Sequence, residues 1–196
     1  MNERQLTRFA ALAVTGAVGL GTAACTSART LDSRTPSSPE ARAGVTTTVT
    51  TTVVSACSTD DLKAAVEPRD AGAGSRFYEI SLTNTGSEPC RVSGYPGVSV
   101  VGHGDGTQLG QDARRSGDAG EATVLIPGAH AVATLQAVNI GTDGGPLGGE
   151  CDAVAADGWR IYPPDSRESV FVQQQGLTAC RSDAEWLTIS GMHPVS

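Results

Sequence analysis

The sequence predicts an all-β protein: an antiparallel immunoglobulin-like β-sandwich preceded by a signal peptide and a disordered tether rich in serine and threonine. Three observations predict this class. Short apolar segments are separated by turns, and the chain of 196 residues holds 24 glycines and 10 prolines. No window carries apolar residues at helical spacing over three turns. Four of the five cysteines follow the N-terminal region, and an even set suits a sandwich closed by disulfides.

Residues 1–24 have the organisation of a secretory signal peptide. Arg4 and Arg8 precede the uncharged stretch 9–20, and small residues follow as far as Ala24. Twelve helical residues rise about 18 Å, which is too short for a hydrocarbon core of about 30 Å. We therefore expect export, and no permanent transmembrane helix.

Cys25 closes this segment in the sequence Thr-Ala-Ala-Cys. The sequence resembles the bacterial lipobox, although Thr22 stands where the lipobox prefers an aliphatic residue. The resemblance implies that Cys25 is acylated on sulfur, with palmitate as an expected group, and becomes the mature N-terminus. The protein would then be held on the cell membrane, facing outwards. The alternative is ordinary cleavage near Ala24, which would release a secreted protein.

Residues 25–56 form the predicted tether. Nearly half of residues 26–56 are serine or threonine, and little in the segment can be buried. A flexible chain of this length spans roughly 30 Å, enough to lift a domain off a membrane. The threonines also suit O-glycosylation. The alternative is that the threonine-rich run 45–54 packs on the domain as a strand.

Residues 57–196 form the predicted sandwich domain. In its clearest strand, residues 77–84, Tyr78, Ile80 and Leu82 share one face. Each of the remaining apolar segments of the domain lies between residues that favour turns. Further strands are predicted over residues 62–66, 98–101, 123–126, 131–140, 159–162, 170–173 and 186–190.

The four cysteines of this domain are Cys57, Cys90, Cys151 and Cys180. An exported chain meets an oxidising environment, which predicts two disulfides, and the absence of close cysteine pairs disfavours zinc. Three pairings are possible. We favour Cys57–Cys90 with Cys151–Cys180, which closes loops of about 30 residues worth roughly 3–4 kcal/mol each.

Two strings carry a family resemblance: Leu-Thr-Asn-Thr-Gly-Ser-Glu-Pro-Cys at 82–90 and Ser-Gly-Tyr-Pro-Gly-Val at 93–98. With Cys57, the Leu-Ile-Pro-Gly at 125–128, and Cys151 ahead of Trp159, they resemble a group of actinobacterial lipoproteins labelled domain of unknown function 4232. The resemblance covers essentially all of residues 57–196. It implies an exported, often lipid-anchored β-sandwich with paired cysteines, and it implies no activity.

The physical chemistry of these strings is structural. Asn84 can bond backbone groups in a turn where Gly86 accepts a positive φ. Tyr95 can hydrogen-bond across a corner of the sandwich, although contact with a ligand is the alternative.

The histidines indicate little chemistry. His103 lies in a glycine-rich stretch, but no helix follows to form a phosphate site, and Asp105-Gly106 favours a hairpin turn. His130 is expected on a solvent face. A soft metal such as Cu(I) could use Met192 and His193 together with His103.

The acidic residues are explained best as solvated turns. No serine lies in a nucleophile elbow, and no basic or aromatic residues surround the acids to form a sugar cleft. A weak calcium site at Asp143 with Glu150 and Asp152 has no repeat spacing to support it. The acidic pairs are Asp60 with Asp61, Asp118 with Glu121, and Glu150 with Asp152.

The charge excludes one class of function. The chain has a formal net charge of −7, and residues 57–196 hold eighteen acids against nine bases, which disfavours nucleic acid. We expect a membrane-anchored, non-enzymatic module without cofactor or metal, for binding a protein or cell-wall partner or for envelope upkeep. The alternatives are a hydrolase acting on envelope polymers and a carrier of a small ligand or metal, which would need a sizeable apolar cavity between the sheets.

Overall fold

The computed structural model describes residues 53–195, so Cys25, the predicted signal peptide and most of the predicted tether lie outside the described residues. The described residues form twelve strands and two short 3-10 helices, η1 (Thr59–Asp61) and η2 (Gly145–Glu150). No helix among the described residues is long and apolar enough to cross a membrane. The strands are β1 (Leu62–Gly72), β2 (Ser75–Asn84), β3 (Cys90–Val92), β4 (Gly97–Gly102), β5 (Thr107–Gln108), β6 (Arg114–Arg115), β7 (Thr123–Leu125), β8 (His130–Val138), β9 (Ala153–Tyr162), β10 (Val170–Cys180), β11 (Leu187–Ile189) and β12 (His193–Pro194).

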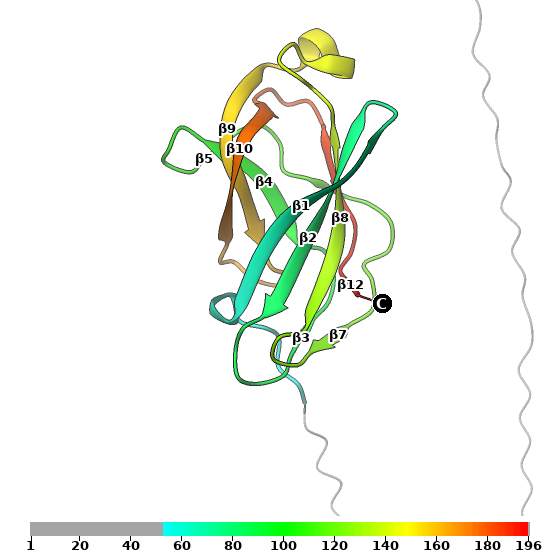
Figure 1. The fold of residues 1–196 in the computed structure, drawn as a ribbon, viewed down its shortest axis with the longest axis vertical. Coiled ribbons are helices and arrows are strands. Elements are labelled where there is room, and N and C mark those ends of the chain that lie inside the picture. Colours follow the sequence, from blue (N-terminus) through cyan, green and yellow to red (C-terminus); the bar gives the residue numbers. More distant parts are fainter. Residues whose placement is uncertain (1–52, 196) are drawn as a thin grey trace, which may run out of the picture. The chain divides into compact units, whose positions relative to one another are not determined.

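Two sheets form the layers of the sandwich (Figure 1). The larger sheet has the order β1-β2-β8-β11-β6, with β12 also paired to β8, and the smaller sheet has the order β10-β9-β4-β5. A separate ribbon joins β3 to β7. Every strand pair is antiparallel except β11 with β6, which run parallel for two residues. The predicted all-β sandwich is therefore confirmed.

The core lies between the inner faces of the two sheets. Along β2 the predicted alternation holds, since Tyr78, Ile80 and Leu82 are buried and the residues between them are partly exposed. Trp159 on β9 is fully buried, and its ring lies 5.3 Å from the ring of Tyr78, centroid to centroid. Each such large apolar side chain contributes about 1.5–3 kcal/mol when it is buried.

All eight predicted strand segments overlap strands of the structure, and five of these strands (β1, β2, β4, β9 and β10) are longer than predicted, with the largest extensions in β1, β9 and β10. β1 continues to Gly72 through a bulge between Pro68 and Asp70, and β10 continues to Cys180 through a register shift between Gln173 and Leu177. β9 begins six residues early, at Ala153. The predicted segments end where polar or small residues interrupt the apolar pattern, although the backbone pairing continues.

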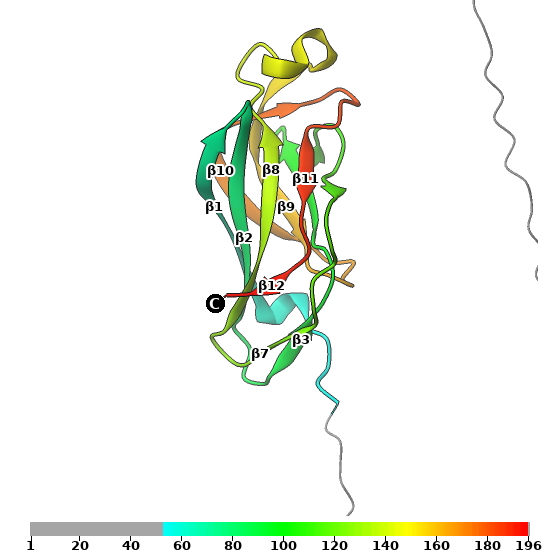
Figure 2. The ribbon, with the colours of Figure 1, turned by 90° about the vertical axis from the view of Figure 1, so that its right-hand side faces the viewer.

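The chain joins the domain slightly before Cys57. Ala56 forms a parallel bridge with Arg91, and the Arg91 backbone N–H donates to the carbonyl of Ser55 at 2.8 Å. These residues enter at the end of the sandwich where β3 and β7 lie (Figures 1 and 2). Ser55 and Ala56, expected in the tether, thus contact the ribbon of β3 and β7.

Candidate functional site

The outer face of the smaller sheet presents an exposed aromatic side chain. Along β10, Phe171, Gln173 and Gln175 are exposed and alternate with the less exposed Val172 and Gln174. Gln174 is partly buried, and its side-chain oxygen accepts a 2.8 Å hydrogen bond from the indole N–H of buried Trp159. Phe171 is 53% exposed although it is a large apolar residue.

Gly158 leaves this face without a side chain at its centre. In the strand register Gly158 lies opposite Gln173 on β10 and opposite Val101 on β4. A Cβ atom at Gly158 would lie 2.2 Å from the carbonyl oxygen of Val172, so only glycine fits the close approach of these two backbones. The outer surface of these three strands therefore has a depression over its middle strand, β9.

The turn between β4 and β5 forms one rim of this hollow. Asp157 accepts a 2.7 Å hydrogen bond from the backbone N–H of Gly104, and the Arg160 guanidinium donates to the carbonyl of Gly106. Within the turn, hydrogen bonds from Thr107 hold the pKa of the Asp105 carboxyl below its usual value. These contacts hold the hairpin beside the exposed face of β9.

The resulting groove has a volume of about 550 Å³. We call it the outer-face groove. It offers one apolar ring, side-chain amides and one carboxylate, which is a set suited to holding a ligand by stacking and hydrogen bonding. Its lining includes Phe171, Gln173, Gln175, Asp157, Ala156 and Val101.

The two disulfides pair the cysteines in chain order. Cys57 is bonded to Cys90, and Cys151 is bonded to Cys180, as the sequence analysis favoured. The first joins the start of the domain to β3. The second joins the residue after η2 to the end of β10, so it closes the loop formed by β9 and β10.

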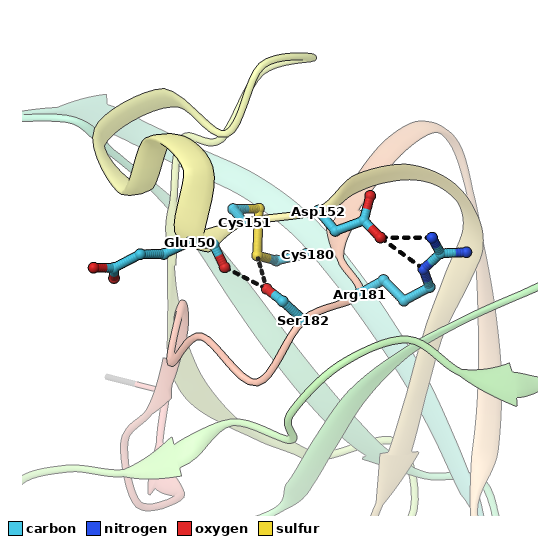
Figure 3. Close-up of polar contacts among 6 residues, drawn as sticks. All are labelled: Glu150, Cys151, Asp152, Cys180, Arg181 and Ser182. Atoms are coloured by element: carbon cyan, nitrogen blue, oxygen red, sulfur yellow. Dashed lines mark hydrogen bonds and ion pairs between the residues drawn. A yellow bond between two sulfur atoms is a disulfide. The ribbon is translucent and has the colours of Figure 1, made fainter.

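Polar contacts surround the second disulfide (Figure 3). Arg181 donates through Nε and Nη2 to Oδ2 of Asp152, at 2.9 and 2.5 Å. The Ser182 hydroxyl donates to the backbone carbonyl of Glu150 at 2.6 Å. The Glu150 carboxylate points away from Asp152 in Figure 3, so these two acids do not form a couple for acid–base catalysis.

The turn after β2 is built on Asn84. Its side-chain nitrogen donates to the carbonyls of Glu88 and Leu125 at 2.8 and 2.9 Å, and its side-chain oxygen accepts from the N–H of Gly86 at 2.9 Å. The positive φ expected at Gly86 is wrong; glycine fits there because a Cβ would lie 2.9 Å from the side chain of Asp61. Tyr95 also has the predicted structural partner, because its hydroxyl donates to the carbonyl of Gly117 at 2.5 Å. The guanidinium of Arg115 lies over the Tyr95 ring, 5.6 Å from its centroid.

One family model matches the part of the chain that contains this turn, the paired cysteines and the strands between them. The family model described as Domain of unknown function (DUF4232) matches residues 57–193. The chain belongs to this family. Searches of curated proteins and of solved structures find no match. The predicted resemblance to this domain family is thus confirmed, and the described sandwich is a DUF4232 domain.

The histidines of the DUF4232 domain lie apart in the fold. His103 follows β4 in the smaller sheet, in the hairpin that Asp105-Gly106 was expected to form. His130 begins β8 of the larger sheet and is exposed, as expected. Met192 is fully buried while its neighbour His193 is exposed on β12, so the two side chains do not face one site together.

The acidic residues that the structure describes do not gather into a metal site. Across residues 53–195, no group of three or more histidine, cysteine, aspartate or glutamate side chains is placed to hold a metal ion. Asp143 accepts from the N–H of Gly145 in a local turn. Asp60, Asp61, Asp118 and Glu121 are exposed, with the first two in η1.

A cavity between the sheets of the DUF4232 domain is small. It has about 180 Å³ and is lined by residues that include Tyr78, Trp159 and Trp186. Sites for small ligands commonly have about 300–1,000 Å³. The outer-face groove is the larger of the two, and it does not lie between the sheets, where a carrier was expected to have its cavity.

The outer-face groove was not predicted from the sequence. Its signal was present in residues 170–173, a predicted strand in which Phe171 and Gln173 alternate with two valines. The valines identify the inner face, and an aromatic residue on the opposite face is therefore exposed. The long-range pairing that places Gly158 beside Gln173 could not be predicted from the sequence.

Proposed function

We propose that this protein is an extracytoplasmic binding module, held at the cell membrane by a lipid on Cys25 and acting without catalysis. The outer-face groove is the observation that carries the binding role, because it exposes Phe171 beside unpaired polar side chains on a sandwich closed by two disulfides. The anchoring role is supported by the signal-like residues 1–24 and by the small residues before Cys25.

The two roles fit together. A tether of about 30 residues spans roughly 30 Å, so a lipid on Cys25 would leave the DUF4232 domain free to meet components of the cell envelope. The acidic surface of residues 57–196 would keep the domain off anionic headgroups. The partner is a component of the envelope, either a protein or a cell-wall polymer.

Anchoring is tested by fractionating cells that produce the wild-type chain, Cys25→Ser or the neighbouring control Ser27→Ala. Wild type and Ser27→Ala should sediment with membranes, and mass spectrometry should find lipid on Cys25. Cys25→Ser should lose the lipid and leave the membrane fraction. An unmodified Cys25 thiol in the mature wild-type protein would contradict the anchor.

Binding is tested with the exported chain carrying Cys25→Ser, so that no lipid obscures the result. This soluble chain should be retained by a purified cell-envelope fraction and should leave the polymers of that fraction intact. Release of soluble fragments from the envelope would favour the hydrolase instead. Recovery of all the protein in the supernatant would contradict the binding module.

A further inference from the structure

Phe171 differs from the other large apolar side chains exposed on the DUF4232 domain. Among residues 53–195 the exposed large apolar residues are Val53, Val124, Ile126, Phe171 and Val195, and Phe171 alone is aromatic. An aromatic ring has a negative face that attracts polarised C–H groups, and a sugar ring offers several on one side. Phe171 is therefore a platform on which a sugar ring can stack.

The groups beside Phe171 match hydroxyls in their hydrogen bonding. Gln173 follows Phe171 at the second position of β10 and shares its exposed face, and Gln175, in the register shift that follows, is also exposed and lines the groove. A carboxamide both donates and accepts, as a hydroxyl does. Asp157 adds a carboxylate, one oxygen of which accepts from Gly104 while the other can accept from a ligand hydroxyl.

The charge of the groove disfavours an anionic ligand. Asp157 is the charged side chain in its lining, and residues 57–196 as a whole are acidic. The neighbouring guanidinium of Arg160 donates to the carbonyl of Gly106. An anionic polymer would therefore be repelled by the domain and would find no ready cation in the groove.

The position of the groove disfavours a peptide that adds to the sheet as a strand. Strand addition needs an unpaired edge, because affinity comes from backbone hydrogen bonds. The groove lies over the faces of β9 and of the edge strand β10, whereas a peptide that adds as a strand would pair along the free edge of β10. Its volume of about 550 Å³ falls in the range of sites for small ligands, about 300–1,000 Å³.

We infer that the outer-face groove binds neutral glycan chains, with Phe171 stacking on a sugar ring and Gln173, Gln175 and Asp157 bonding its hydroxyls. The inference rests on the proposed function, since it names the ligand class of the same groove. A neutral polysaccharide of the cell envelope would be the natural form of such a ligand.

The test uses the exported chain carrying Cys25→Ser and three soluble probes: maltohexaose, mannohexaose and tri-N-acetylchitotriose. We expect at least one probe to shift the backbone NMR signals of Phe171, Gln173 and Gln175 with a Kd of about 1 mM or lower. Phe171→Ala should weaken this binding about tenfold or more, equivalent to about 1.4 kcal/mol. Asp157→Asn keeps an acceptor for Gly104 and should weaken it less.

Ile126→Ala is the matched control, since Ile126 is also exposed, at 62%, and lies just after β7, outside the groove. It should leave the affinity unchanged, and thermal melting should find both alanine variants folded. Glycan binding would be overturned if no probe shifts these signals, or if Phe171→Ala binds as tightly as Ile126→Ala.

The outcome is distinguishable from failure of the proposed function. If the soluble chain is retained by the envelope fraction but ignores all three probes, the binding module stands and its ligand is not a neutral glycan. If the envelope fraction does not retain the chain either, both proposals fail.

Discussion

The side-chain nitrogen of Asn84 lies 2.9 Å from the carbonyl oxygen of Leu125 and donates a hydrogen bond to it across 41 residues of the chain. Asn84 is 1% exposed, and its backbone N–H and C=O bond Ala129 and Gly128 as well. One side chain thus ties the end of β2 to the end of β7. The family string around Asn84 has a structural explanation in these bonds.

We expect Asn84→Ala to lower the free energy of unfolding by about 2–3 kcal/mol, because the carbonyls of Glu88 and Leu125 lose their donor in a buried position. Urea denaturation measures the loss. Ser87→Ala, in the exposed part of the same turn, should change stability by no more than about 0.5 kcal/mol. Equal stability of the two variants would contradict this account of the turn.

Gly158→Ala should destabilise the domain by about 1–3 kcal/mol, since its Cβ would collide with the carbonyl of Val172 and push β9 from β10. Gly149→Ala is the control, because a Cβ there meets nothing within 4 Å and no positive φ opposes it. Denaturation curves of the two variants should separate clearly. If Gly158→Ala and Gly149→Ala have the same stability, the close approach of the two strands is wrong.

Removing each disulfide should cost a similar amount. The sequence separations are 33 and 29 residues, so loop closure predicts about 3–4 kcal/mol for either pair. The paired variants Cys57→Ala with Cys90→Ala, and Cys151→Ala with Cys180→Ala, test this by chemical denaturation. A fully stable variant would mean that the bond concerned is absent from the exported protein, which peptide mapping without reduction can check.

The carboxyl of Asp105 should titrate below its ordinary pKa of 3.8, because Thr107 donates to it through its side chain and its backbone. Since the pKa is lowered by folding, the stabilisation is complete above the unfolded value and is lost as pH falls through the folded one. Thr107→Val removes the hydroxyl and should raise the pKa of Asp105, as measured by carbon NMR. An unchanged pKa in this variant would assign the shift to the backbone alone.

Local patterns predicted much of this fold, and pairing over long distances explains what they missed. The alternation around Ile80 identifies β2 and its buried face, and the turn residues Asn84 and Gly86 identify its end. The strands β3, β5, β6 and β12 have two or three residues each, too few to carry a period. They exist because neighbouring strands offer partners.

The candidate site was hidden for a related reason. Phe171 and Gln173 could be assigned to one face from the sequence, but the groove beside them is also lined by Asp157 from β9 and by the turn after β4. These parts come together only through the register of three strands. The pairing of the cysteines was a choice among three possibilities, which only the structure could decide.

The Cys57–Cys90 bond has a mechanical consequence. The chain enters the sandwich at Ser55 and Ala56, which bond Arg91, and two residues later it is covalently joined to β3. Tension on the N-terminal segment would pass through sulfur into β3 and the Asn84 turn, before it could pull on the hydrogen bonds of β1. A domain pulled from this end would resist unzipping of its first strand.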